Sequence, residues 1–367
     1  MTVRTEPAPA GRSSVTPGPV LRTPPGMPSR SRTAAACVGA LTLLAVAMVA
    51  ALSLGEVVLD PAAVLGALAG TADGGTVLIV VEFRMPRVLA GALAGACLAA
   101  SGALLQALLR NPLASPDVVG VSHGGAAGAV IALATGVPAA LVPLGVFAGA
   151  LVSTTALVLL AWRRGLDGER VVLVGIGLAA LALTVVTWAV VTFPLTVAQQ
   201  ALLWTTGSLA GRTWPEVGIS ALAAVVLLPL ALIQLRRLAV LDLGDELARS
   251  LGLPPDRARL LLLVTAVVLA ATGVALAGPV AFVALGVPHL ARACSGPPRP
   301  GVPSAGNLLL GALLGAILVV LADLIAGSAL ARPIPVGVVT ATLGAPWFCW
   351  VLVRGARAER TAGRVAS

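Results

Sequence analysis

The 367-residue sequence contains no lysine and no tyrosine, and it has only two histidines and four cysteines. Without lysine there is no G-x-x-x-x-G-K-[ST] loop, the commonest means by which a chain binds ATP by itself. The cysteines lie in or near apolar segments, without the spacing of a metal site, at positions 37, 97, 294 and 349. We therefore interpret them as small packing residues and expect no cofactor, no metal centre and no enzymatic activity.

Charged and aromatic residues are also scarce. Charged residues make up 11% of the chain and hydrophobic residues 58%, whereas soluble domains carry about 25% charged residues. The net charge of +9 comes from scattered arginines, and aromatics are only 3% of the chain. This pattern argues against a nucleic-acid partner, which would need clustered cations and stacking rings. The composition predicts an all-α, polytopic membrane protein.

Apolar stretches of spanning length are abundant, since a transmembrane helix needs roughly 20 apolar residues. We predict ten spans, at about 33–54, 88–108, 118–136, 139–161, 171–192, 217–235, 259–277, 279–294, 305–325 and 336–353. A more polar segment around Gln199 and Gln200 is expected to form a short helix on the outer surface.

The arginines fix the expected orientation, because cytoplasmic loops of membrane proteins are rich in basic residues. With ten spans and an inside N-terminus, 20 of the 24 arginines fall on the inner side. Both termini are thus expected in the cytosol. Residues 1–32, with seven prolines and five arginines, are expected to form a disordered cytosolic tail, and residues 355–367 a second tail, around a transmembrane domain at 33–354.

Arg84 and Arg87 lie on the outer side, which is otherwise poor in arginine. The segment Arg84-Met85-Pro86-Arg87 is predicted to open the second spanning helix, with Pro86 in its first turn. Cations oppose the dipole at a helix N-terminus, so something other than helix stability should favour them. One interpretation is a docking point for carboxylates of an extracytoplasmic partner. Contact with lipid phosphates, or a local pair with Glu82, is the alternative.

Two inner loops are candidates for contact with a cytosolic partner. The first, Arg110–Asp117, contains Asn111 and Pro112 and is predicted to be a rigid turn, or else a plain connector. The second contains a short amphipathic helix within Leu243–Gly252, in which leucines recur at i, i+4 and i+8. Gly252 is predicted to cap it. Its apolar stripe must be covered either by the rest of this protein or by another one.

Few residues could carry protons through the membrane. Asp323 is the only acid within a predicted span, and we expect it to pair with a nearby outer arginine. His123 and His289 are the only imidazoles, and His289 is expected to make a structural hydrogen bond. A proton-coupled carrier usually needs more ionisable groups near the bilayer midplane.

Several motifs, in order, resemble the FecCD family of permease subunits from bacterial ABC importers. The resemblance runs from about residue 34 to 354 and includes Arg84–Gly91, Ser101–Ser122, Trp204–Leu209, Leu243–Leu253, Gly278–Arg292 and Pro335–Pro346. The family imports ferric siderophores, haem and vitamin B12 through the bacterial cytoplasmic membrane. The resemblance implies ten helices per subunit in the fold of the vitamin B12 permease, which is a type II ABC importer.

The resemblance also implies partners and site residues. The expected partners are a second permease copy or paralogue forming a dimer, cytosolic ABC ATPase subunits, an extracytoplasmic substrate-binding protein and membrane lipid. Arg84 and Arg87 match the family's outer pair, which meets acids of the binding protein. The family often has a further arginine four residues after the aspartate of helix nine, where this chain has Gly327; Arg332 is the candidate substitute. Candidate residues for coupling to the ATPase are Asn111, Pro112, Leu243, Gly244, Asp245, Glu246, Leu247, Ala248, Leu251 and Gly252.

The sequence thus predicts the permease subunit of an ATP-driven importer, most directly one for a ferric siderophore. Import of vitamin B12 or haem by the same mechanism is the first alternative. An ion-coupled secondary transporter, or an efflux or structural membrane protein without a binding protein, is the second.

Overall fold

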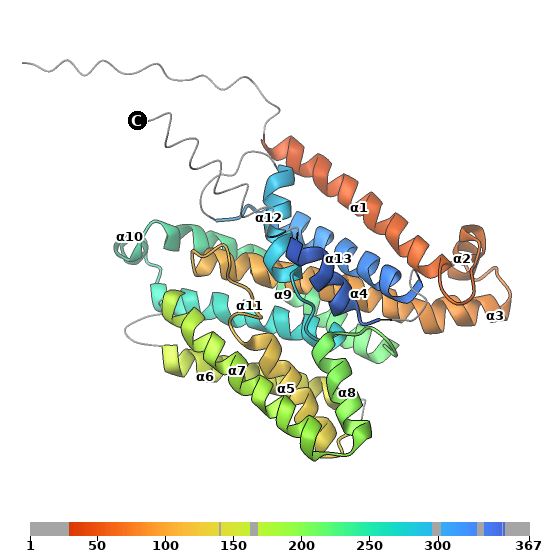
Figure 1. The fold of residues 1–367 in the computed structure, drawn as a ribbon. Helices are drawn as coiled ribbons and strands as arrows, with labels where there is room; N and C mark the ends of the chain where they lie inside the picture. The colour runs from red at the N-terminus through yellow and green to blue at the C-terminus, as the bar shows by residue number, and fades with distance from the viewer. Residues whose placement is uncertain are drawn as a thin grey trace, which may run out of the picture.

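The computed structural model describes residues 29–138, 141–161, 168–295, 302–328, 334–346 and 348. Over these ranges the chain is a bundle of helices without a β-strand (Figure 1). The helices are α1 (Ser29–Ser53), α2 (Pro61–Leu68), α3 (Gly74–Val77), a π-helix (Leu78–Arg84), α4 (Met85–Leu108), α5 (Val121–Ala134), α6 (Val142–Ala161), α7 (Gly168–Thr192), α8 (Leu195–Thr206), α9 (Trp214–Asp242), α10 (Asp245–Ser250), α11 (Pro255–Ala277), α12 (Val283–Ser295) and α13 (Ala305–Ser328). A last helical segment covers Val336–Pro346.

Each of the ten predicted spans coincides with a helix, but not all of these helices have spanning length. Among the described residues seven are long and apolar enough to cross a membrane, namely α1, the continuous run Gly74–Leu108, α6, α7, α9, α11 and α13. The helices α5 and Val336–Pro346 are apolar but shorter, and α12 has 13 residues. The count of ten crossings therefore stays a prediction. The predicted surface helix near Gln199 is present as α8.

The predicted start of the second span was wrong. The helix begins at Gly74, where the carboxylate of Asp73 accepts a hydrogen bond from the Thr76 amide at 3.0 Å. It continues through the π-helix into α4, so Pro86 lies inside a run of 35 residues rather than in a first turn. The Met85 amide donates to the Val80 carbonyl, five residues back. This wider turn directly before Pro86 relieves the contact between the proline ring and the preceding carbonyl that a straight α-helix would force.

The centre of the bundle is built from α4 and α11, which are the most buried of the seven long helices. Small residues allow α4 to approach its neighbours closely. A Cβ atom on Gly95 would collide with the Gly315 carbonyl of α13, and one on Gly102 would collide with the Ala284 carbonyl of α12. Glycine at these positions is therefore what permits the close contact between the helix backbones. Bulkier side chains there would force the helices apart.

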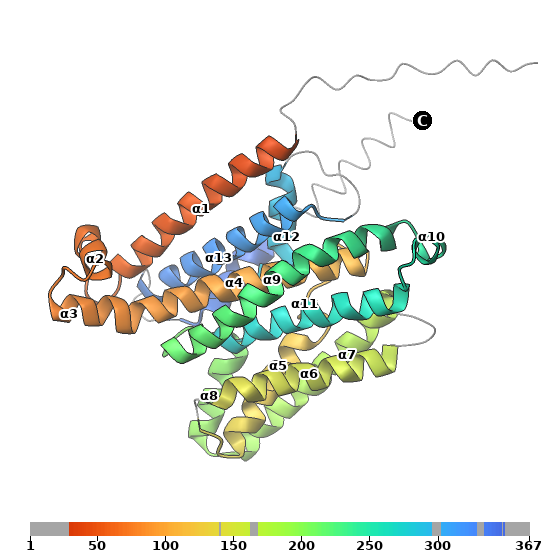
Figure 2. The same ribbon diagram turned by 180° about the vertical axis from the view of Figure 1, so that it is seen from behind.

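The two ends of the bundle carry different features. At one end, α9 finishes beside the short helix α10, and we call this the α10 end (Figures 1 and 2). Arg110, just after α4, donates from Nη2 to the Leu241 carbonyl of α9 at 3.0 Å, which places the α4–α5 loop at the same end. The opposite end carries α2 and α3, and there α9 begins and α11 finishes; we call it the α2 end (Figure 2).

Candidate functional site: two ends of a helical bundle

The helix α10 is shorter than predicted, because Gly244 and Leu251 flank it rather than belong to it. Gly244 precedes it with φ 103°, a conformation that favours glycine. After its last turn, the Gly252 amide donates to the Arg249 carbonyl at 3.0 Å and the Leu253 amide to the Ala248 carbonyl at 2.9 Å. This is the Schellman arrangement, and it confirms the predicted cap at Gly252.

The apolar stripe of this loop is not covered by the chain itself. The exposed fractions are 58% for Leu243, 54% for Leu247 and 64% for Leu251, while Ala248 is buried against the bundle. These three exposed leucines, on and beside α10, give an apolar surface to a loop that is otherwise charged. Such a surface is typical of a contact site. The structure thus excludes coverage by the described part of the chain, which was one of the two alternatives open from the sequence.

A salt bridge holds α10 to the next helix. Asp245 accepts two hydrogen bonds from the Arg259 guanidinium of α11, at 2.6 and 3.1 Å. Arg249 adds a weaker ion pair to the same carboxylate at 3.9 Å. The hydrogen bonds from Arg259 lower the pKa of the Asp245 carboxyl below its usual value. Asp245 therefore joins α10 to α11 through a bidentate side-chain contact, in addition to the loop that connects the two helices.

The α4–α5 loop is a rigid turn, as predicted. Arg110 adopts φ 49°, and the Asn111 amide donates to the Gln106 carbonyl at 3.1 Å, which ends α4 in a second Schellman arrangement. The Asn111 side chain accepts from the Leu113 amide at 2.9 Å. The Pro112 carbonyl accepts from the Nε2 of His289 on α12 at 2.9 Å. The predicted structural hydrogen bond of His289 is confirmed, and it anchors this loop to α12.

At the α2 end, the Arg84 side chain is hydrogen-bonded to backbone carbonyls. Its guanidinium donates from Nη1 to the carbonyls of Leu52 at 2.6 Å and Ser53 at 3.2 Å, and from Nη2 to the Val57 carbonyl. The Leu52 and Ser53 carbonyls end α1, so a cation here favourably meets the negative end of that helix dipole, and the Val57 carbonyl belongs to the loop that follows. Among the described residues Arg84 forms no pair with Glu82. Arg84 thus joins the end of α1 to the long helix.

Arg87 and Asp323 form a bidentate ion pair between α4 and α13. Nε of Arg87 lies 2.8 Å from Oδ2 of Asp323, and Nη2 lies 2.9 Å from Oδ1. The predicted pairing of Asp323 with an outer arginine is confirmed. About a third of the Arg87 side chain stays exposed, so this guanidinium can still meet a second carboxylate. Arg332 lies outside the described residues.

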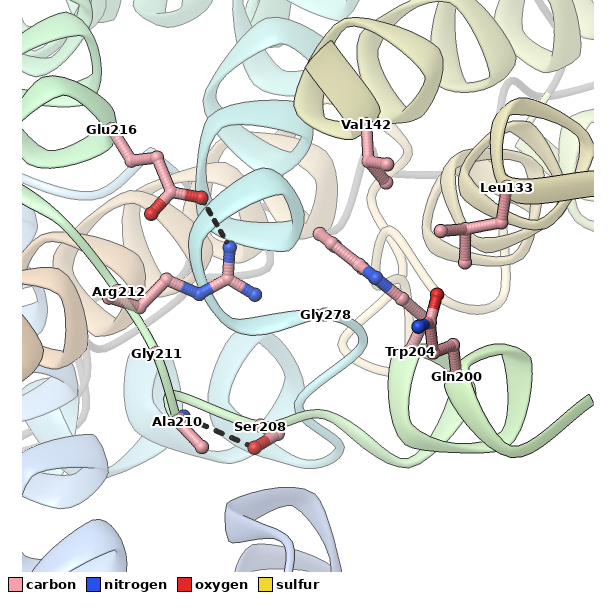
Figure 3. A pocket seen from close by; sticks show the side chains of 10 residues that line it. All are labelled: Leu133, Val142, Gln200, Trp204, Ser208, Ala210, Gly211, Arg212, Glu216 and Gly278. Carbon is pink, nitrogen blue, oxygen red and sulfur yellow. Dashed lines mark hydrogen bonds and ion pairs between the residues drawn. The ribbon is translucent and has the colours of Figure 1, made fainter. Parts of the chain in front are cut away.

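A cavity of about 260 Å³ at the α2 end was not predicted from the sequence (Figure 3). It lies between α8, the start of α9, the end of α11 and the facing ends of α5 and α6. Its lining comprises Leu133, Val142, Gln200, Trp204, Ser208, Ala210, Gly211, Arg212, Glu216 and Gly278. From the sequence, Arg212 was counted only as one of four outer arginines. Most of the cavity lining lies within residues 200–216, and the rest comes from Leu133, Val142 and Gly278.

The seven long apolar helices, with a candidate contact surface at each end of the bundle, indicate a polytopic membrane protein. Comparison with known proteins agrees. The model of the FecCD transport family matches residues 43–354, and the chain belongs to this family.

Individual relatives share a third or more of their residues with this chain. The ferric enterobactin transport system permease protein FepG of Escherichia coli is 39% identical, covering 88% of this chain and 96% of its own. The Fe(3+)-citrate import system permease protein YfmE of Bacillus subtilis is 39% identical, covering 86% and 94%. The vitamin B12 import system permease protein BtuC of Salmonella schwarzengrund is 40% identical, covering 76% and 85%.

A solved structure has the same architecture. A metal-chelate type ABC transporter in an inward-facing conformation superposes with a TM-score of 0.75 at 25% identity, covering 88% of this chain and 99% of that one. The chain is therefore similar in fold, over almost its whole described length, to an ABC transporter.

Proposed function

We propose that this chain is the membrane-spanning permease subunit of an ATP-driven importer, and that its cargo is a ferric siderophore. The family, the ferric-chelate relatives and the fold support this proposal. The main observation behind the proposal is the row of exposed leucines on and beside α10. A permease without its own nucleotide site needs a surface on which an ATPase can act. Import of vitamin B12 is the second candidate, because the 40% identical relative BtuC is named for it.

In this proposal the α10 end faces the cytosol and binds ABC ATPase subunits, and both termini lie on that side. Leu243, Leu247 and Leu251 enter an apolar groove of the ATPase, while the rigid turn at Asn111 and Pro112 supports them from α4. When ATP binding closes the ATPases, the displacement of α10 reaches α11 through the Asp245–Arg259 bridge. The bundle then switches between outward- and inward-facing states, as a dimer with a second permease copy or a paralogue.

The α2 end in this proposal faces outward and receives a substrate-binding protein. Of the two candidate docking arginines that the structure describes, Arg87 is the better placed, because 38% of its side chain is exposed. Arg84 contributes indirectly, by holding the end of α1 in place. Arg332 remains a candidate from the sequence.

Leu247→Asp tests the coupling surface. Because Leu247 is more than half exposed, we expect the variant to fold normally but to bind the ATPase subunit at least tenfold more weakly, since a charge now enters an apolar groove. Leu65→Asp is the matched control, because Leu65 is 56% exposed but lies on α2 at the opposite end. ATPase affinity and ATP-driven uptake of ferric chelates are measured in proteoliposomes. Equal ATPase binding by both variants would refute the role of α10.

A further inference from the structure

The Arg212 cavity is built around a cation whose hydrogen-bonding capacity is only partly used. Only 10% of the Arg212 side chain is exposed. Its Nη1 donates to Oε1 of Glu216 at 2.8 Å. Its Nε is buried and has no hydrogen-bond partner among the described residues. A buried guanidinium N–H without an acceptor is costly, so the described residues satisfy this cation only in part. The nitrogen that an added acceptor can reach is the second terminal one, which is directed into the cavity (Figure 3).

The acid beside Arg212 is already engaged elsewhere. Oε2 of Glu216 accepts hydrogen bonds from the Thr213 amide at 2.9 Å and the Thr213 hydroxyl at 3.1 Å, forming the capping box that starts α9. Glu216 therefore shares its charge between the helix start and one guanidinium nitrogen. The N–H groups of Arg212 that do not contact Glu216 are left to donate to another oxygen.

The opposite wall of the cavity orients the guanidinium. Its central carbon lies 4.9 Å from the centre of the Trp204 ring, within the range of a cation–π contact. Figure 3 shows the second terminal nitrogen of Arg212 directed into the space between it and Trp204, with Gln200 on the same side as the indole. Leu133 and Val142 supply apolar surface nearby. A cation held against an indole, with an amide and apolar side chains beside it, suits an anionic oxygen carried on a partly apolar group.

We propose that this cavity binds an oxyanion arm of the cargo, a carboxylate or catecholate group of an anionic ferric chelate, as the cargo enters the permease. This inference rests on the proposed import function and names a substrate class for it. The volume of about 260 Å³ exceeds what one carboxylate needs but falls just below the range of whole-ligand pockets, so it accommodates part of a chelate. A single carboxylate side chain of the binding protein would leave most of that volume unfilled.

Binding is tested on the full chain, purified in maltoside detergent, which brings no phosphate of its own. The probes are radiolabelled gallium(III) citrate, which is anionic, and an electroneutral gallium(III) tris(hydroxamate), each measured by equilibrium dialysis. We expect Arg212→Met to weaken citrate-complex binding roughly tenfold or more, since it removes charge-assisted hydrogen bonds. Binding of the neutral chelate should change less than twofold, and Arg212→Lys should recover part of the loss.

Glu216→Gln separates a binding role from a purely structural one. Glutamine keeps the capping box but removes the competing anion. If Arg212 has a binding role, Glu216→Gln should therefore bind gallium citrate more tightly than the wild type. A structural ion pair alone predicts that Arg212→Met and Glu216→Gln weaken both probes alike, and that result would overturn the proposal. So would unchanged citrate binding in Arg212→Met. Inorganic phosphate that displaces the complex at equal concentration would also overturn it, by indicating a general phosphate site.

Two further measurements distinguish cargo binding at this cavity from docking of the binding protein and from the import function itself. If Arg212→Met lowers affinity for the binding protein and leaves gallium citrate binding intact, the cavity receives the partner instead of the cargo, and the proposal fails. ATP-driven uptake by the complete transporter is assayed separately. Failure of uptake in the wild-type complex, with gallium citrate binding still dependent on Arg212, would reject the import function alone.

Discussion

The bidentate pair between Arg87 and Asp323 should make α4 and α13 depend on each other for stability. Arg87→Met removes the cation and leaves a carboxylate of which only 13% is exposed. Breaking a fully buried pair from one side costs about 3–5 kcal/mol. Because 38% of the Arg87 side chain is exposed, solvent screens the interaction, and we expect roughly 2 kcal/mol.

The double variant Arg87→Met/Asp323→Leu should recover most of this loss, because two apolar side chains replace the pair without leaving a charge. A double-mutant cycle on the free energy of unfolding, measured by titrating the detergent-solubilised protein with dodecyl sulfate, gives the coupling energy directly. We expect a coupling energy of about 2 kcal/mol. A value below about 0.5 kcal/mol, within the error of additivity, would refute the reasoning.

Three other outcomes are expected. Gly102→Ala should destabilise the protein by roughly 3 kcal/mol, since its Cβ would collide with the Ala284 carbonyl, whereas Gly311→Ala should stay within about 0.5 kcal/mol; thermal unfolding of both variants checks this. The stability contributed by Asp245 should be constant above about pH 5 and be lost as the pH falls from there through its lowered pKa, because protonation breaks the bridge to Arg259. The thermal midpoints of the wild type and of Asp245→Asn are measured as a function of pH. If the bridge were unimportant, the difference between the two midpoints would show no such decline. Asp323→Asn should keep binding-protein affinity within twofold, because Arg87 retains its charge; surface plasmon resonance measures it.

Local patterns predicted much of this molecule. The helix segments follow from apolar runs of spanning length, and the cap of α10 follows from Gly252, whose φ of 78° favours glycine. Pairing of Asp323 was predictable because an acid in a span needs a cation and few were available on its side. In each case the deciding residues lie close together in the sequence, or the choice of partners is small.

What escaped prediction depends on contacts between distant segments. Nothing near Arg84 indicates that its acceptors are carbonyls about 30 residues earlier, at the end of α1. The true start of the long helix at Gly74 was missed because Pro86 suggested a first turn, whereas a π-helical segment carries the helix through. The cavity at Arg212 needs residues 200–216 to meet Leu133, Val142 and Gly278, and no local pattern indicates that meeting.

The unbroken helix from Gly74 to Leu108 is longer than a membrane crossing requires. At about 1.5 Å per residue, its 35 residues extend roughly 52 Å, against a hydrocarbon thickness near 30 Å. Even at a steep tilt of about 40°, some 26 residues suffice for the hydrocarbon crossing, so roughly nine extend into the headgroup layers. In the proposed orientation, any excess at the α2 end places α2, which packs against the π-helix, at the level of the outer lipid headgroups, where a docking protein would meet both.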